Sequence, residues 1–160
     1  MTSRLVLVAV IQAVIAAVAV LAPSTGQPDP SAPAVEQRRQ PPAAGSAESE
    51  YNRGVRARVA KDWKAAETAF RQAITLRAAF PEAWNELGYA LRNQGRYPES
   101  LKAYDEALRL RPEFPEALEY LGEAFVKVGR LEDARQVLDR LRALDAGRAR
   151  ELAEVIQKGK

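Results

Sequence analysis

Apolar residues in the middle of the chain recur at helical spacing and outline a pair of helices. Trp84, Leu87 and Leu91 are separated by three and four positions, which places them on one face of a helix. Gly95 supplies the left-handed residue that ends a helix, and a second segment of helical period follows it. Pro112 ends that second segment because proline cannot continue a helix interior. The pattern therefore predicts a helical hairpin.

The same pattern returns after a shift of 34 residues. Gly54, Gly88 and Gly122 align under this shift, and the sequence Phe-Pro-Glu-Ala occurs at 80–83 and again at 114–117. The second and third blocks share ten identical residues. A fixed period between about 20 and 50 residues is typical of a solenoid, in which each unit buries the apolar face of its neighbour. The three blocks are residues 47–80, 81–114 and 115–148.

Residues 149–160 follow the third block and predict one more helix. Leu152, Val155 and Ile156 form a single apolar stripe, while most of the other residues are charged or polar. Such a helix can cover the open end of a solenoid with its apolar side and present its polar side to water. We therefore predict an all-α fold, an α-solenoid of three hairpins with a C-terminal capping helix. A helix that binds in a groove or self-associates is the alternative.

Residues 1–22 predict a membrane anchor or a signal peptide. The segment from Leu5 to Ala22 contains a single polar residue, and as a helix its 18 residues would span about 27 Å, close to the apolar thickness of a bilayer. This length favours an uncleaved anchor. A cleaved secretory signal is the alternative, since Ala17 and Ala19 provide small residues before a cut.

Residues 23–46 have the composition of a disordered linker. They hold six of the ten prolines, no aromatic residue and no apolar periodicity, so they cannot bury enough apolar surface to fold. We expect a spacer between the apolar segment and the repeats. Because a short N-terminal tail usually stays in the cytoplasm, the repeats are expected outside it, on the periplasmic side of a bacterial membrane. A soluble periplasmic or secreted protein is the alternative if the apolar segment is cleaved.

The residue composition excludes several kinds of active site. The chain has no cysteine and no histidine, so it lacks thiolate ligands, cysteine nucleophiles, and the commonest general base and metal ligand. No pair of carboxylates stands out as an acid–base pair. We therefore expect no enzymatic activity, no metal and no other cofactor. The net charge of +3 is too small to indicate a nucleic-acid ligand by itself.

The region from 47 to 148 resembles the tetratricopeptide repeat (TPR) family. The second block carries the family's pattern at Trp84, Leu87, Gly88, Gly95, Tyr97, Tyr104, Ala107 and Pro112. The first block departs from the pattern at Glu50, Arg53 and Lys61, where the family usually has a large apolar residue, a leucine and a glycine. Terminal repeats are often atypical because one of their faces meets water.

In this family the first helices of successive hairpins line a concave surface that holds extended peptides or helices. The resemblance implies that this surface begins with basic and aromatic residues here and ends with acidic ones. Its arginines and Asn93 are suited to hold an acidic peptide or a carboxylate through charge-assisted hydrogen bonds. Trp63 and Trp84, by contrast, are expected in the core. The predicted partner-binding residues are Tyr51, Arg58, Asn85, Tyr89, Arg92, Asn93, Glu119, Glu123 and Lys127.

We therefore predict a protein–protein interaction scaffold or adaptor, tethered to a membrane, that binds a peptide or partner protein on the concave surface. A soluble exported adaptor is the alternative. A remote alternative is a nucleic-acid or anionic-lipid binder, but aromatic stacking residues are not interleaved with the basic ones, so no nucleic-acid partner is expected. Self-association through the solenoid ends is another interaction that three repeats allow. The basic residues in question are Arg38, Arg39, Arg53, Arg56, Arg58 and Lys61.

Overall fold

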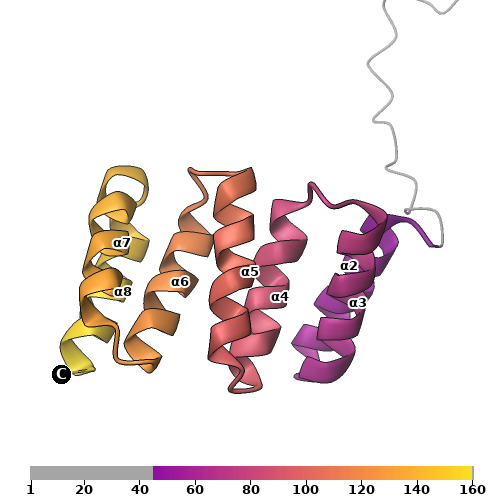
Figure 1. Ribbon diagram of the computed structural model, residues 1–160, viewed down its shortest axis with the longest axis horizontal. Coiled ribbons are helices and arrows are strands. Elements are labelled where there is room, and N and C mark those ends of the chain that lie inside the picture. Colours follow the sequence, from indigo (N-terminus) through magenta and orange to yellow (C-terminus); the bar gives the residue numbers. More distant parts are fainter. Residues whose placement is uncertain (1–44, 160) are drawn as a thin grey trace, which may run out of the picture. The chain divides into compact units, whose positions relative to one another are not determined.

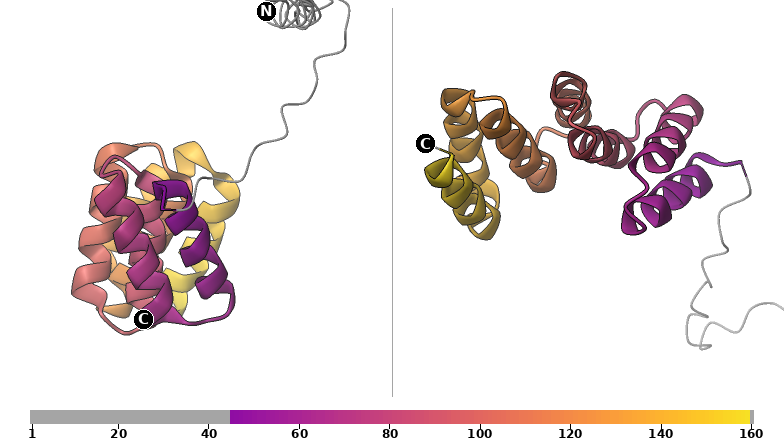
Figure 2. Two further views of the ribbon diagram at one scale, coloured as in Figure 1. Left: turned by 90° about the vertical axis from the view of Figure 1, so that its right-hand side faces the viewer. Right: turned by 90° about the horizontal axis from the view of Figure 1, so that it is seen from below.

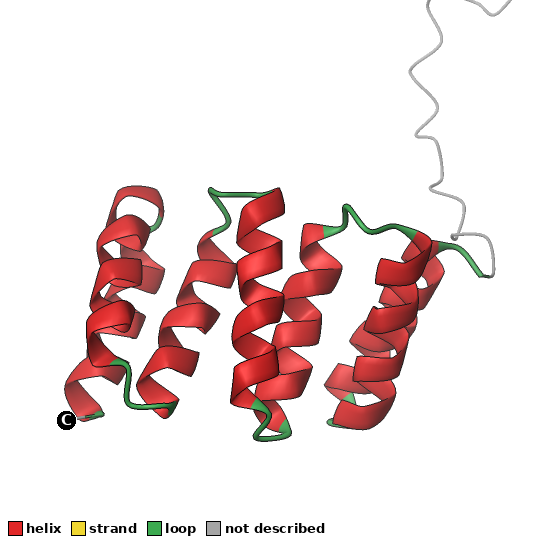
Figure 3. Cartoon of the chain, in the orientation of Figure 1, coloured by secondary structure: helices red, strands yellow, loops and turns green. Residues whose placement is uncertain are grey.

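The computed structural model describes residues 45–159, and within them it consists of helices and turns (Figure 3). The predicted apolar segment from Leu5 to Ala22 and nearly all of the predicted linker lie outside the described residues. None of the described helices combines the length and the apolar character that crossing a membrane requires. The seven described helices are α2 (Ala47–Val59), α3 (Trp63–Leu76), α4 (Pro81–Asn93), α5 (Tyr97–Leu110), α6 (Pro115–Lys127), α7 (Leu131–Leu144) and α8 (Ala146–Lys158).

Consecutive helices of the described part pack against one another in chain order (Figure 1). They form the hairpins α2–α3, α4–α5 and α6–α7, followed by α8, so the predicted all-α solenoid is confirmed for these residues. Viewed along the helices, α2, α4, α6 and α8 lie on the inner side of a shallow arc, and α3, α5 and α7 lie on the outer side (Figure 2, right). We call these two sides the inner face and the outer face.

Six of the seven described helices begin with a capping side chain or a proline in the first positions, and α7 has neither. Helices α2, α3 and α8 follow Ser46, Asp62 and Asp145, whose side chains accept hydrogen bonds from backbone N–H groups of the first turn. Helices α4 and α6 instead start at Pro81 and Pro115. Proline lacks a backbone N–H, and at the first position of a helix this N–H would have no partner within the helix. The chain thus satisfies or removes N–H groups that a helix start leaves without partners.

Each hairpin turns through a residue in the left-handed backbone conformation. Gly95 and Gly129 have φ angles of 76° and 77°, which glycine adopts without steric cost. Lys61 occupies the equivalent place in the first hairpin with φ 58°. A residue with a Cβ is destabilised there by roughly 1–2 kcal/mol. The first hairpin therefore keeps the turn geometry of the other two, although it lacks their glycine.

Glycines in the first helices allow side chains from other helices to lie against their backbone. A Cβ added to Gly88 would lie 2.6 Å from the ring of Tyr104, which α5 contributes. In the third hairpin a Cβ on Gly122 would lie 2.5 Å from Leu152, which belongs to α8. Helix α8 is thereby joined to the third hairpin at the same kind of contact that joins α4 to α5.

Helix α8 covers the end of the described solenoid. Its buried side chains are Ala149, Leu152 and Ile156, and they belong to the same apolar cluster as α6 and α7. Val155, which the apolar stripe of the sequence also includes, is only partly buried. The apolar stripe therefore packs on the preceding hairpin along one edge and leaves Val155 at the margin of the inner face.

Candidate functional site

The charged residues at the ends of the inner-face helices are divided by sign across the solenoid. Helices α2, α4 and α6 run in the same direction, with glutamates in their first turns and basic residues in their last turns. The helix dipole favours this arrangement. Beside the expected division into a basic start and an acidic end, the inner face therefore has two opposite rims. The acidic rim contains Glu48, Glu82 and Glu116, and the basic rim contains Arg58, Arg92 and Lys127.

An aromatic patch lies between the rims, formed by Trp63, Tyr89 and Tyr120. The ring centroids of Tyr89 and Tyr120 are 5.1 Å apart, and the ring of Trp63 stands edge-on to Tyr89 at 5.9 Å. All three side chains are only partly buried. Trp84 is partly buried too, but it packs against two core clusters and donates from Nε1 to the carbonyl of Ala78 at 2.9 Å. Trp63 packs against none of the core clusters of the described residues, so the core position expected for it is not observed.

Arg92 is held by residues of its own chain. Its guanidinium lies 5.1 Å from the ring centroids of both Tyr89 and Tyr120 and forms an ion pair with Glu123. Its side chain is 15% exposed. Although burial opposes the charge, Tyr104 and Glu123 keep the pKa of Arg92 above its ordinary value. Arg92, which we predicted to contact a partner, thus already forms an ion pair between α4 and α6.

Other predicted residues also have partners within the chain. Arg58 lies 3.0 Å from the carboxylate of Glu86 and 5.7 Å from the ring centroid of Tyr89. Glu119 is 5% exposed and forms an ion pair with Arg148 of α8. Burial raises the pKa of Glu119 even though Arg148 acts in the opposite direction. These contacts join α2 to α4 and α6 to α8 across the inner face.

Two more predicted residues are placed mainly by packing. The ring of Tyr51 lies 5.7 Å from that of Phe70 and 5.0 Å from that of Phe80, and burial, aided by Glu86, raises the pKa of Tyr51 to about 12. Asn85 is 1% exposed, although helical spacing places it on the inner side of α4. Neither residue presents much surface to a large partner.

The remaining predicted residues come together in a cavity on the basic rim. The cavity has a volume of about 480 Å³ and lies among α4, α5, α6 and α8. Lys127 forms no ion pair with any residue that the structure describes, and Asn93 donates from its side chain to the carbonyl of Tyr89 at 2.8 Å. The residues that line this cavity are Arg92, Asn93, Tyr97, Glu123, Lys127 and Val155.

Two of these cavity residues were not among the predicted partner contacts. Tyr97 is the aromatic residue that begins α5, and Val155 belongs to the apolar stripe of α8. The sequence signals of both residues indicated packing alone. Their place at the cavity follows from the way α8 lies beside α6, which repeat spacing does not specify.

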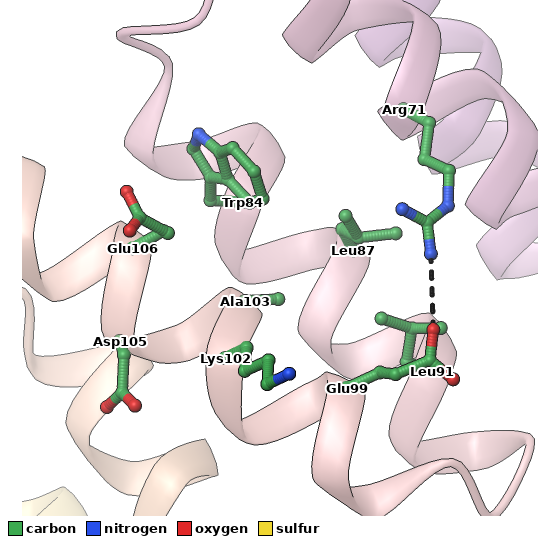
Figure 4. Close-up of a pocket in the computed structure, with 9 residues that line it drawn as sticks. All are labelled: Arg71, Trp84, Leu87, Leu91, Glu99, Lys102, Ala103, Asp105 and Glu106. Atoms are coloured by element: carbon green, nitrogen blue, oxygen red, sulfur yellow. Dashed lines mark ion pairs between the residues drawn. The ribbon is translucent and has the colours of Figure 1, made fainter.

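A second cavity opens on the outer face, between α3 and α5 (Figure 4). Its volume is about 570 Å³, and it contains none of the predicted partner-binding residues. Its floor is apolar and includes Trp84, Leu87 and Leu91. Arg71 reaches across the opening to Glu99 at 3.7 Å. The larger cavity of the two therefore lies away from the face that the repeat pattern singles out.

Solved structures share this fold at low sequence identity. The TPR2B domain of yeast Sti1, in a complex with pHsp70, is 24% identical, with a TM-score of 0.67 over 71% of this chain and 94% of that one. The Arabidopsis OM64 TPR domain is 17% identical, with a TM-score of 0.68 over 72% and 97%. The Yersinia enterocolitica secretion chaperone SycD, in a complex with a YopD peptide, is 17% identical, with a TM-score of 0.64 over 69% and 91%.

The sequence itself matches a family model, while no curated protein matches it. The model is that of the tetratricopeptide repeat, and it matches residues 51–112 and 85–149. These two matches together cover more than half of the chain and include helices from all three hairpins. The chain therefore belongs to the tetratricopeptide repeat family.

Proposed function

We propose that the protein is an interaction scaffold that binds a peptide or partner protein on its inner face. The observation that carries this proposal is the aromatic patch beside the cavity of the basic rim. Aromatic residues are the side chains most often found to anchor partners, and Lys127 adds a charge that the described part of the chain does not neutralise. Peptide complexes of similar folds support the same use, namely Sti1 TPR2B with pHsp70 and SycD with a YopD peptide.

Within this surface the contacts divide into anchors and supports. Tyr89, Asn93 and Lys127 are the residues we assign to partner contact, since each lies at the patch or the cavity and keeps part of its side chain exposed. Arg58 and Arg92 act as supports, because each would give up an intrachain carboxylate if it turned to a ligand.

The proposal includes a tether to a membrane. The apolar segment from Leu5 to Ala22 is long enough for an anchor, and residues 23–46 would hold the repeats away from the bilayer, outside the cytoplasm. Cleavage after the apolar segment would give the soluble exported form instead. Alkaline extraction of membranes and N-terminal sequencing of the mature protein separate the two forms, because an anchored chain stays with the bilayer and keeps its first residues.

Crosslinking followed by affinity capture of the full-length chain tests the binding surface. Lys127→Glu and Tyr89→Ala should each lower the yield of captured partners, because they reverse an exposed charge and remove an anchor. Lys64→Glu is the matched control, since Lys64 is an exposed lysine on α3 of the outer face. Equal partner yields from wild type and both inner-face variants would show that partners bind elsewhere, and a Lys102→Glu variant would then test the outer cavity.

A further inference from the structure

The acidic rim has one glutamate without an arginine. In the first hairpin Arg77 pairs with Glu48, and in the second Arg111 pairs with Glu82. The same spacing in the third hairpin places Asp145 opposite Glu116, and Asp145 accepts hydrogen bonds from the backbone at the start of α8 instead. Within the described residues Glu116 consequently forms no ion pair.

The carboxylate of Glu86 lies close enough to Glu116 for their negative charges to repel each other. Glu86 is 7% exposed, and its pKa is raised to about 7, because burial disfavours its charge more strongly than Arg58 supports it, and Glu116 adds repulsion. The hydroxyl of Tyr120 donates to Glu116 at 3.3 Å, and it is the only side-chain donor that Glu116 has within the described residues. Arg148 is close enough to Glu116 for their charges to attract, but it forms its ion pair with Glu119, so the charge of Glu116 is offset only in part.

Oxygen acceptors at this place also lack donors. The Oδ1 atom of Asn85 and one carboxylate oxygen of Glu86 are buried and accept no hydrogen bond from any described residue. Arg58 Nε lies 3.0 Å from that oxygen, outside the geometry of a hydrogen bond, and is itself buried without an acceptor. The ion pair with Arg58 therefore accounts for the Glu86 oxygen, whereas Oδ1 of Asn85 is left without a donor among the described residues. Asn85 and Glu86 follow Glu82 by three and four positions, so helical spacing places them on either side of Glu82 on α4. Buried acceptors without donors are uncommon in folded proteins, and each calls for a donor group.

We propose that the acidic rim between α4 and α6 is a subsite for a cationic side chain, lysine or arginine, of the peptide bound on the inner face. Glu116 and Glu82 are its partly exposed members, and Asn85 and Glu86 are its buried members. An ammonium or guanidinium group carries several N–H donors and no acceptor, which matches the partly offset charge of Glu116 and the unpaired acceptor of Asn85. This subsite rests on the proposed function, since it specifies the chemistry of the ligand.

The nature of the cation follows from the residues present. No group of three or more acidic residues within the described part is arranged to hold a metal ion, which favours an organic cation. The sequence suggested an acidic ligand, because of the arginines on this surface. At the acidic rim, by contrast, the ligand must carry a positive charge. A peptide with a basic residue at the acidic rim and an apolar or acidic residue at the other rim fits both halves of the inner face.

Small cations test the subsite without knowledge of the natural partner. The full-length chain in detergent micelles is titrated with n-butylammonium and n-butylguanidinium, and ¹H–¹⁵N correlation spectra report the side-chain amide of Asn85 and nearby backbone amides. We expect saturable shifts with either cation, and none with butyrate. Tetramethylammonium carries the same charge without N–H donors, so it should bind more weakly by at least about fivefold.

Variants separate the subsite from general attraction of cations. Glu116→Gln should weaken butylammonium binding by about fivefold, the upper range for a partly exposed ion pair. Glu151→Gln is the matched control, because Glu151 is an exposed glutamate on α8 without an ion pair among the described residues, and it should leave binding unchanged. Equal losses in both variants, or no saturable shift in wild type, would overturn the subsite.

The pH dependence gives an independent readout. Glu86 faces Arg58 and Tyr51 from α2, Glu116 and Tyr120 from α6, and Glu82 on its own helix. Binding of butylammonium should weaken as pH falls from 8 to 6, because Glu86 takes up a proton in this range; a flat profile would contradict its role.

The cation titration and the partner capture distinguish failure of the subsite from failure of the proposed function. If partners are captured through the inner face but butylammonium does not bind, the proposed function stands and the subsite is wrong. If butylammonium binds and Glu116→Gln weakens it, while inner-face variants leave partner capture unchanged, the subsite stands and the proposed function is wrong.

Discussion

Leu152 of α8 lies against the backbone of Gly122, the place on the third hairpin that corresponds to the contact of Tyr104 with Gly88. Leu152 is fully buried and lies in the same apolar cluster as Leu118, Leu121 and Leu141. Helix α8 is therefore part of the packing of the third hairpin, and the stability of α6 and α7 depends on it.

Shortening this side chain should be costly. Leu152→Ala is expected to lower the free energy of unfolding by about 3 kcal/mol, the usual range for a leucine cavity that closes incompletely. Urea unfolding followed by circular dichroism of the full-length chain measures the change. Val155→Ala removes apolar atoms from the same helix at a partly exposed site and should cost less than about 1 kcal/mol. Equal losses would mean that α8 does not pack through Leu152.

The turn of the first hairpin offers a stabilising change. Lys61 has a φ of 58° at the position that Gly95 and Gly129 occupy in the other hairpins. Lys61→Gly should raise the free energy of unfolding by about 1 kcal/mol, because it removes the steric cost of the left-handed conformation. Gln72→Gly, at an exposed position in the middle of α3, should instead lower it by up to about 1 kcal/mol, since glycine is unfavourable in a helix interior. Thermal unfolding should show changes in stability of opposite sign for the two variants, an increase for the turn variant and a decrease for the helix variant.

Glu86 should make the stability of the fold depend on pH. Its pKa is raised to about 7 in the folded chain, mainly by burial, against an ordinary value of 4.5. The folded chain therefore binds more protons than the unfolded one between these values, and its stability falls as pH rises through them. At about 1.4 kcal/mol per pKa unit, the effect amounts to at most about 3 kcal/mol. Glu86→Gln should be more stable than wild type at pH 8 and lose this dependence.

Glu82 provides a control of opposite sign. Burial raises the pKa of Glu82, but the hydrogen bond from Arg111 outweighs it, so the net shift is downward. A depressed pKa contributes stability above the unfolded value of 4.5 and loses it as pH falls through the folded pKa. Glu82→Gln should therefore lower stability at pH 7, where Glu86→Gln leaves it equal or higher. Chemical unfolding of both variants across a pH series makes the comparison.

The hairpins were predictable from the sequence because their signals are local. Glycine at 95, proline at 112 and apolar residues at helical spacing each act within one or two turns. The absence of an arginine for Glu116 was also within reach, since the 34-residue shift aligns Arg77 and Arg111 with Asp145. The inner face as a surface followed from the repeat resemblance.

The ion pairs that the inner-face residues form within the chain were not predictable in the same way. Arg92 pairs with Glu123 across 31 residues, and Arg58 with Glu86 across helices, and both pairings depend on how closely α2, α4 and α6 stack. Trp63 occupies a repeat position that suggested packing, yet its ring meets Tyr89 beside the groove. Sequence periodicity gives the face on which a side chain lies, whereas its partner is set by the distance between helices.

Arg92 and Lys127 should respond differently to substitution, although both line the cavity of the basic rim. Arg92→Met leaves Glu123 without its cation and removes the guanidinium between two tyrosine rings, so stability should fall by about 1–3 kcal/mol. Arg92→Lys keeps the charge but not the planar contact, and should recover part of the loss. Lys127→Glu reverses an exposed charge on the same rim and should leave stability within about 0.5 kcal/mol of wild type.

Chemical unfolding and partner capture of the three variants give separate readouts. Arg92→Met should lose both stability and partner binding, whereas Lys127→Glu should lose partner binding alone. Loss of partners without loss of stability in Arg92→Met would instead make Arg92 a direct partner contact.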